Sequence, residues 1–308
     1  MAGLVEDALD DGEGAGVIGV SVSFRVGVLG HLASTSLKER NVDGRSSAGN
    51  WGIQDQRQAL RWVKDNIAAF GGDPDNVLIF GHSSGGGSVS QHMVVPESFD
   101  LFHKAIVHSG SFSNWAAHSW QAAEHTFQAV AVAAGCAEAA ADAASVSADA
   151  AVRDCLIALP WAAIQAAGRD DHAAGGTGVP CRDGCAFAPV VDGVELPQFP
   201  WQLAQSGTRW PGGRPGRAGE RWSGPLIQST TYDDGASYSY VPADGDEAAL
   251  RRYWSLMFGD EHVDELLQLY PPAAYAAEAA GEAEPTHNGI PPHSLSADYS
   301  PEYWAAAR

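Results

Sequence analysis

A short apolar run stops abruptly at a pair of serines enclosed by glycines, in the segment VLIFGHSSGGGSVS at 77–90. Four consecutive apolar residues at its start are typical of a strand in a parallel sheet, which is buried on both faces. The residues that follow are small and run on to Pro96, which favours a helix that packs closely on that strand. We therefore predict a strand at 77–80, a sharp turn at Ser83, and a helix from about Gly85.

The turn has the pattern G-x-S-x-G, the nucleophile elbow, formed by Gly81, Ser83 and Gly85. At such a turn the serine backbone is strained, and the strain lifts the hydroxyl out of the sheet. The residues two before and two after the serine come close together. We therefore expect that neither position has room for a Cβ atom and that both must be glycine. Ser83, unlike Ser84, has glycine on both sides at this spacing and is the candidate nucleophile. The alternative is an ordinary Gly/Ser turn between a strand and a helix.

Alternating strand and helix patterns around the elbow indicate an α/β fold with a largely parallel sheet. Residues 17–25 are β-branched and apolar and predict a strand, and residues 104–110 predict another. Residues 54–70 predict an amphipathic helix that ends at a glycine pair. Its apolar stripe comprises Ala59, Leu60, Val63, Ile67 and Phe70. Helical periodicity recurs at 119–135, 151–159, 247–258 and 262–269. We expect residues 137–151 and 206–225 to be surface connections.

The net charge of −20 excludes several classes of function. Nucleic-acid binding depends on Lys and Arg, and so does attraction to anionic membranes. We expect the acidity to serve solubility, with a weaker role in steering cationic substrates. No apolar run is long enough to span a bilayer. The acidic N-terminal segment lacks the basic and apolar regions of a signal peptide. The cysteine spacing matches no zinc site, and we expect neither metal nor organic cofactor.

Residues 49–111 closely resemble the type-B carboxylesterase family, which includes the cholinesterases. The segment VSVSFRVGVLGHLAS at 20–34 is similar to the family's strand and "NYRLG.LGFL" motif. Farther along, FAPVVDGVELPQFPWQLAQSG at 187–207 is similar to "F.PVVDG..LP..P", and QSTTYDDG at 228–235 is similar to "G.T.DEG". The resemblance implies an α/β-hydrolase fold, with a mostly parallel central sheet flanked by helices, as a single partial domain over 1–308. It also implies hydrolysis of small-molecule carboxylic esters through an acyl-enzyme on serine.

The resemblance assigns roles to individual residues. Ser83 matches the nucleophile, and Ser84 matches the residue whose backbone N–H forms one arm of the oxyanion hole. Asp234 matches the acidic member of the triad, where the family usually has the longer glutamate. Asp233 lies one step off the motif and is the second candidate. His82 stands where the family usually has glutamate, and we expect it to be structural because adjacent side chains in an elbow point apart.

The resemblance also pairs Cys136 with Cys155 as the family's small loop disulfide, with two buried free thiols as the alternative. Cys181 and Cys185 are expected to be ordinary loop thiols. A disulfide suits an oxidising compartment, so we expect a secreted or extracellular full-length protein.

Two parts of the family's catalytic machinery have no counterpart, so we expect a chain truncated at both ends. The HGGG oxyanion strip belongs upstream of the strand at 17–25, and DDGEGAG is no substitute for it. One lost donor lowers transition-state stabilisation by about 3–4 kcal/mol. After the acid only His262, His287 and His293 follow, none in the family's histidine context, and we expect surface histidines. Without a base, a rate loss of about a millionfold is expected.

The expected function is therefore an impaired serine esterase. The alternatives are a non-catalytic cholinesterase-like binding or adhesion module and an inactive gene fragment. The retained serine, elbow glycines and acid favour the esterase, because a binding module has no need of a strained elbow. A sheet that lacks its outer strands has exposed edges, which favour association.

Overall fold

The computed structural model divides into two compact units, Met1–Gly176 with Phe187–Thr230, and Thr177–Ala186 with Thr231–Arg308. The structure describes residues 16–39, 46–110, 112, 117–169, 187–206, 222, 224–231, 247–248, 250–251 and 262–271. The sheet and the elbow belong to the first unit. The expectation of one domain over 1–308 stays a prediction.

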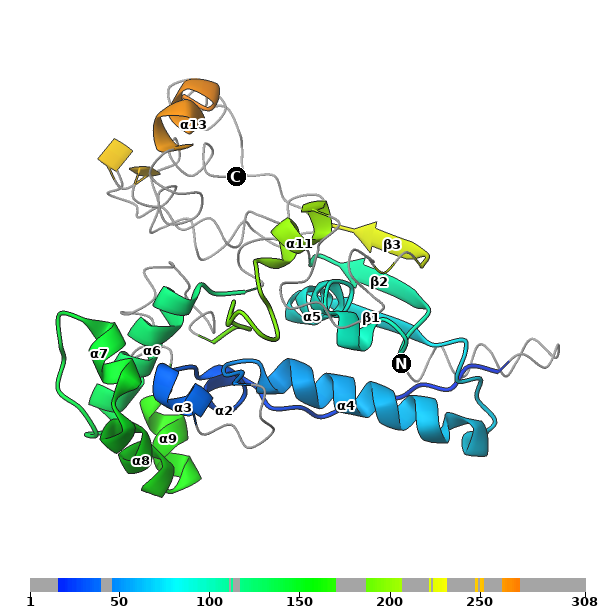
Figure 1. Cartoon of the computed structure of the whole chain (residues 1–308). Coiled ribbons are helices and arrows are strands. Elements are labelled where there is room, and N and C mark those ends of the chain that lie inside the picture. Colours follow the sequence, from blue (N-terminus) through cyan, green and yellow to red (C-terminus); the bar gives the residue numbers. More distant parts are fainter. Residues whose placement is uncertain are drawn as a thin grey trace, which may run out of the picture. The chain divides into compact units, whose positions relative to one another are not determined.

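Three parallel strands form the described sheet in the order β1-β2-β3 (Figure 1). They are β1 (Leu78–His82), β2 (Lys104–His108) and β3 (Leu226–Ser229), and each pairs in parallel with the next. Parallel neighbours need a long crossover connection, and helix α5 (Ser84–His92) lies in the one between β1 and β2. The predicted strands at 77–80 and 104–110 and the parallel sheet are confirmed.

Helix α5 covers one face of this sheet. Val89 and Met93 pack with Phe102, Ala105 and Val107 in one apolar cluster. The opposite face of β1 stays exposed, with 44% of Leu78 and 50% of Phe80 accessible to solvent. The expectation that β1 is buried on both faces is therefore wrong. Among the described helices, α5 is the one in extensive contact with β1 and β2.

The amphipathic helix predicted at 54–70 is present as α4 (Trp51–Asn66), continued by the 3-10 turn η1 (Ile67–Phe70). It ends at Gly71, whose φ of 84° is the left-handed conformation that glycine adopts readily. The predicted apolar stripe is only partly correct. Phe70 is 63% exposed, whereas Arg57 is buried because it pairs with an acidic side chain described below.

The strand predicted at 17–25 does not form. Residues 16–26 carry no regular secondary structure and lead into α2 (Gly27–His31) and α3 (Thr35–Glu39). Six apolar side chains in this segment are 38–63% exposed: Val17, Ile18, Val20, Val22, Phe24 and Val26. A strand needs a neighbour to complete its hydrogen bonds, and none pairs with it within the described residues.

Four helices pack around a second apolar core in the first unit, to which Val28 and Leu32 at α2 also contribute (Figure 1). They are α6 (Trp120–Ala133), α7 (Ala143–Ala148), α8 (Ala150–Ala158) and α9 (Trp161–Ala167). The helices predicted at 119–135 and 151–159 are thus confirmed. Helix α7 falls inside the expected connection at 137–151, where the Asp142 side chain caps it by accepting from the N–H of Ala144. No single described helix is long and apolar enough to cross a membrane, although α8 and α9, bent by 119°, pass that test as a pair.

The remaining described helices are α11 (Pro200–Ser206) in the first unit and α13 (Val263–Leu269) in the second. Helix α13 confirms the pattern at 262–269. Of the helix predicted at 247–258, residues 247–248 and 250–251 are described and helical. Arg251 there forms ion pairs with Glu247 and Asp264.

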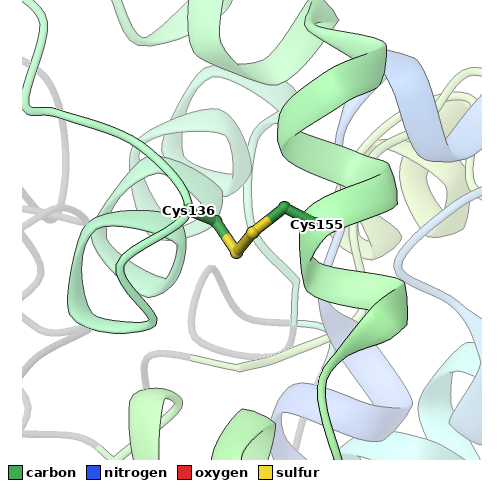
Figure 2. The surroundings of a disulfide bond; sticks show 2 residues. All are labelled: Cys136 and Cys155. Carbon is green, nitrogen blue, oxygen red and sulfur yellow. A yellow bond between two sulfur atoms is a disulfide. The ribbon is translucent and has the colours of Figure 1, made fainter.

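A disulfide joins Cys136, in the loop after α6, to Cys155 on α8 (Figure 2). The Cα atoms of the two cysteines are 5.7 Å apart. Cys136 packs against the core cluster of the four helices, so the bridge fastens a loop onto that core. The pairing expected from the family resemblance is confirmed.

We predict that replacing both cysteines, Cys136→Ser with Cys155→Ser, lowers the free energy of unfolding by about 3 kcal/mol, because the bridge restricts the unfolded chain. Urea denaturation of the two proteins measures the difference. Thiol titration of the unreduced native sequence in denaturant serves as the control. At most two cysteines should react, and four reactive thiols would exclude the bridge.

Candidate active site

Ser83 lies at the corner where β1 ends and α5 begins. Its φ of 55° and ψ of −123° place a residue with a side chain in a region that L-residues rarely adopt. Two main-chain hydrogen bonds hold this conformation. The N–H of Ser83 donates to the carbonyl of His108 at 2.9 Å, and its carbonyl accepts from the N–H of Gly87 at 3.0 Å. The backbone strain expected of a nucleophile elbow is confirmed.

The two elbow glycines differ in what they contribute. A Cβ atom at Gly81 would lie 2.2 Å from the carbonyl oxygen of Gly85, so no larger residue fits there. A Cβ atom at Gly85 would meet no described atom within 4 Å. The two glycines do come close together, as expected. The Cβ direction of Gly81 points at the carbonyl of Gly85, whereas that of Gly85 points away from Gly81. The expectation that both positions exclude a side chain is therefore wrong for Gly85.

A second close approach holds α5 on the next strand. A Cβ atom at Gly110, just past β2, would lie 2.6 Å from the Cα atom of Gly86. The first turn of α5 thus rests on the ends of both strands through glycine contacts.

Ser84 is the first residue of α5. The N–H groups of the first turn have no acceptor within their own helix, and together they carry a partial positive charge. The N–H of Ser84 therefore lies at the positive end of α5, directly after the candidate nucleophile.

A chain of polar contacts connects α4 to the first turn of α5. The buried ring of His92 is bonded through Nδ1 to the Ser98 hydroxyl at 2.9 Å and through Nε2 to Oε1 of Gln56 at 3.0 Å. The amide nitrogen of Gln56 donates to the hydroxyl of Ser88 at 3.3 Å, and that hydroxyl donates to the carbonyl of Ser84 at 3.1 Å. Because Oε1 of Gln56 can only accept, Nε2 of His92 carries the proton.

Burial is the main cause that lowers the pKa of His92 to about 3, and the nearby positive charge of Arg57 lowers it further. His92 is therefore neutral at physiological pH.

Arg57 and Glu195 form a fully buried ion pair between α4 and the loop before α11. Both guanidinium nitrogens Nη1 and Nη2 bind the carboxylate, the latter at 3.0 Å. Burial alone would lower the pKa of Arg57, but the hydrogen bond and charge of Glu195 outweigh it and raise the pKa. The Asn50 side chain also joins the start of α4 to this part of the chain: it donates to the carbonyl of Val190 at 2.8 Å and accepts from its N–H at 2.9 Å. The sequence reasoning missed these contacts, although Arg57 follows the apolar Ile53 at a helical spacing of four.

A different ion pair anchors the exposed segment at 16–26. Arg25 donates from Nε and Nη2 to the carboxylate of Asp55 on α4, both at 2.7 Å. The hydrogen bond to Arg25 is the main cause that lowers the pKa of Asp55. This contact holds the chain against α4 where the expected strand is absent.

Histidine side chains end two neighbouring strands beside the serine. His82 ends β1, and its partner in register is His108, which ends β2. Nδ1 of His108 is bonded to the hydroxyl of Ser229 on β3 at 2.6 Å. The sequence predicts a structural role for His82 and none for His108, although the place of His108 in the predicted strand at 104–110 is an available signal.

Several predicted residues lie outside the described residues: Asp233, Asp234, His287, His293, Cys181 and Cys185. His262 is described, exposed and part of the second unit. The described site therefore consists of Ser83, Ser84, the elbow glycines and the polar contacts behind α5.

We predict that two alanine substitutions at the elbow differ strongly in their effect on stability. Gly81→Ala should destabilise the protein by about 3 kcal/mol or more, because its Cβ meets main-chain atoms that cannot move aside. Gly85→Ala has open space and should change stability by at most about 1 kcal/mol, since alanine favours the helix. Thermal or urea denaturation of both variants tests the pair, and equal losses would contradict the geometry.

We also predict that His92 makes stability depend on pH. Its pKa is about 3 in the folded protein against an ordinary 6.5, so the unfolded chain binds one more proton between these values. The free energy of unfolding should therefore fall as the pH drops below 6.5, by up to about 1.4 kcal/mol per pH unit.

Urea titrations across this pH range should show a shallower slope for His92→Gln. Burial also lowers the pKa of His31, which adds to the slope in both proteins, so the difference between them isolates His92. Identical slopes would show that His92 is not buried as a neutral ring.

The structure is similar to that of a solved PNB esterase, with a TM-score of 0.58 and 28% identity over 81% of this chain and 46% of that one. The expected α/β-hydrolase fold is confirmed. The chain is 52% identical over 91 residues to the acylcarnitine hydrolase of Mus musculus and 50% identical over 95 residues to the cholinesterase of the same species. These matches cover about a third of this chain and 15% of each relative's length. The model of the carboxylesterase family matches residues 8–212, more than half of the chain, and this protein therefore belongs to that family.

Proposed function

We propose that this protein hydrolyses carboxylic esters through an acyl-enzyme on Ser83. The observation that carries the proposal is the strained backbone of Ser83 at the corner between β1 and α5. Such strain persists only where the surrounding structure enforces it, and it is concentrated at functional sites. Membership of the carboxylesterase family supports the same chemistry.

In the proposed reaction, Oγ of Ser83 attacks the acyl carbon, the alcohol leaves, and water then releases the acid from the serine ester. Negative charge develops on the carbonyl oxygen during each attack. The N–H of Ser84 and the positive end of α5 are already in place beside the serine, so this charge is stabilised without reorganisation of the protein. The polar contacts from His92 end at the carbonyl of Ser84, which belongs to the next peptide along, and so support the first turn of α5.

The proposal assigns the acidic role to Asp234, with Asp233 as the second candidate. A histidine base would take the serine proton and pass it to the leaving alcohol. Since the sequence has no HGGG strip and no histidine in the family's context, we propose weak turnover. Hydrolases that lose a triad member keep about 10³–10⁴-fold catalysis over water through the remaining groups.

The test uses p-nitrophenyl acetate with the wild-type chain, Ser83→Ala and Ser84→Ala. We predict that the wild type forms an acetyl ester at Ser83, detected by mass spectrometry, and that Ser83→Ala forms none at this position. Ser84→Ala keeps its main-chain N–H and should still be acetylated at Ser83. Equal rates in wild type and Ser83→Ala, with no acetyl-serine in either, would favour the non-catalytic binding module instead.

A further inference from the structure

Two exposed histidines lie side by side at the carboxyl end of the sheet. His82 on β1 and His108 on β2 are direct partners in the parallel register. Adjacent strands are separated by about 4.7–4.9 Å, so the two Cα atoms are near neighbours.

Both side chains project from the same face. Ala105 and Val107 on β2 face α5, as their shared apolar cluster shows, and the Cβ direction of Gly81 on β1 also points at α5. Successive side chains of a strand alternate between faces. His82 and His108 therefore both project from the opposite face, which is the exposed one.

The ring of His108 is held in a defined orientation. Its Nδ1 atom is bonded to the hydroxyl of Ser229, its own partner in register on β3, at 2.6 Å. This contact leaves Nε2 as the nitrogen that can meet a ligand. Histidines that bind metals almost always have their other ring nitrogen held by an oxygen in this way.

We propose that His82 and His108 together bind a divalent transition metal ion, with Zn²⁺ as the representative. Two imidazole nitrogens at about 2.0–2.1 Å from a tetrahedral zinc ion are about 3.3 Å apart. Rings on neighbouring strands of one sheet face reach this separation by side-chain rotation. Within the described ranges no group of three or more His, Cys, Asp or Glu side chains could hold a metal, so water completes the coordination at this surface site.

The zinc proposal does not rest on the proposed function. His82 directly precedes Ser83 in the chain, but adjacent side chains at the elbow point apart, so the ion would lie on the exposed face of the sheet.

Calorimetric titration of the full chain with zinc chloride at neutral pH tests the binding. We predict that His82→Ala and His108→Ala each weaken zinc binding at least about tenfold, because each leaves a single imidazole in place of a chelating pair. Ser229→Ala, which frees the ring of His108, should weaken binding by about 10–100-fold. His125→Ala on α6 is the matched control and should bind as the wild type does. Magnesium, which prefers oxygen ligands, should not compete.

No detectable zinc binding by the wild type, or equal affinity in the wild type and both histidine variants, would overturn the proposal. Circular dichroism checks that each variant is folded. If His108→Ala does not fold, the zinc affinity of His82→Ala, which is substituted at an exposed position, still tests the proposal.

Discussion

The contact between Gly81 and the carbonyl of Gly85 is the constraint on which the rest of the site depends. Strand β1 ends at His82 and helix α5 begins at Ser84, so a single residue makes the turn. This is possible only because Gly81 has no side chain to collide with Gly85. That tight turn forces the unusual backbone of Ser83 and brings the positive end of α5 beside it. The second contact, between Gly86 and Gly110, extends the same close packing to β2. The geometry of the serine thus follows from missing side chains rather than from an added interaction.

Polar contacts, some buried and some half-buried, connect α5 to helix α4. His92, Gln56 and Ser88 connect α4 to α5, and the ion pair of Arg57 with Glu195 lies on the same helix α4. A buried ion pair adds little net stability compared with apolar residues, but the loss of one partner is costly. These contacts are directional, unlike apolar packing, and they connect α4 to α5 and to the loop before α11 at defined atoms.

The sequence predicted those features that depend on local pattern or on a long family motif. The elbow, the helix at 54–70, the strands at 77–80 and 104–110, and the disulfide all follow from such signals. The strand at 17–25 failed because β-branched residues form a strand only beside a neighbour, which local pattern does not report. Gly85 was misjudged because the motif gives the residue type but not the direction of its Cβ. The partnerships of His82 with His108 and of Arg57 with Glu195 join distant positions, so they require the register of the sheet and the path of the loop.

The separation of Arg57 from Glu195, 138 residues along the chain, bears on how the protein reaches its native state. Helices α6 to α9 and the disulfide lie within this interval, so their contacts with one another can form early, although their apolar core also includes Val28 and Leu32 from before it. Closing the long interval adds an entropic barrier that grows with its length. During synthesis Arg57 therefore emerges well before Glu195. The charge of Arg57 on α4 stays unpaired with this carboxylate until the loop at 187–196 has been made. Docking of that loop and the later pairing of β3 with β2 are the steps that complete the unit.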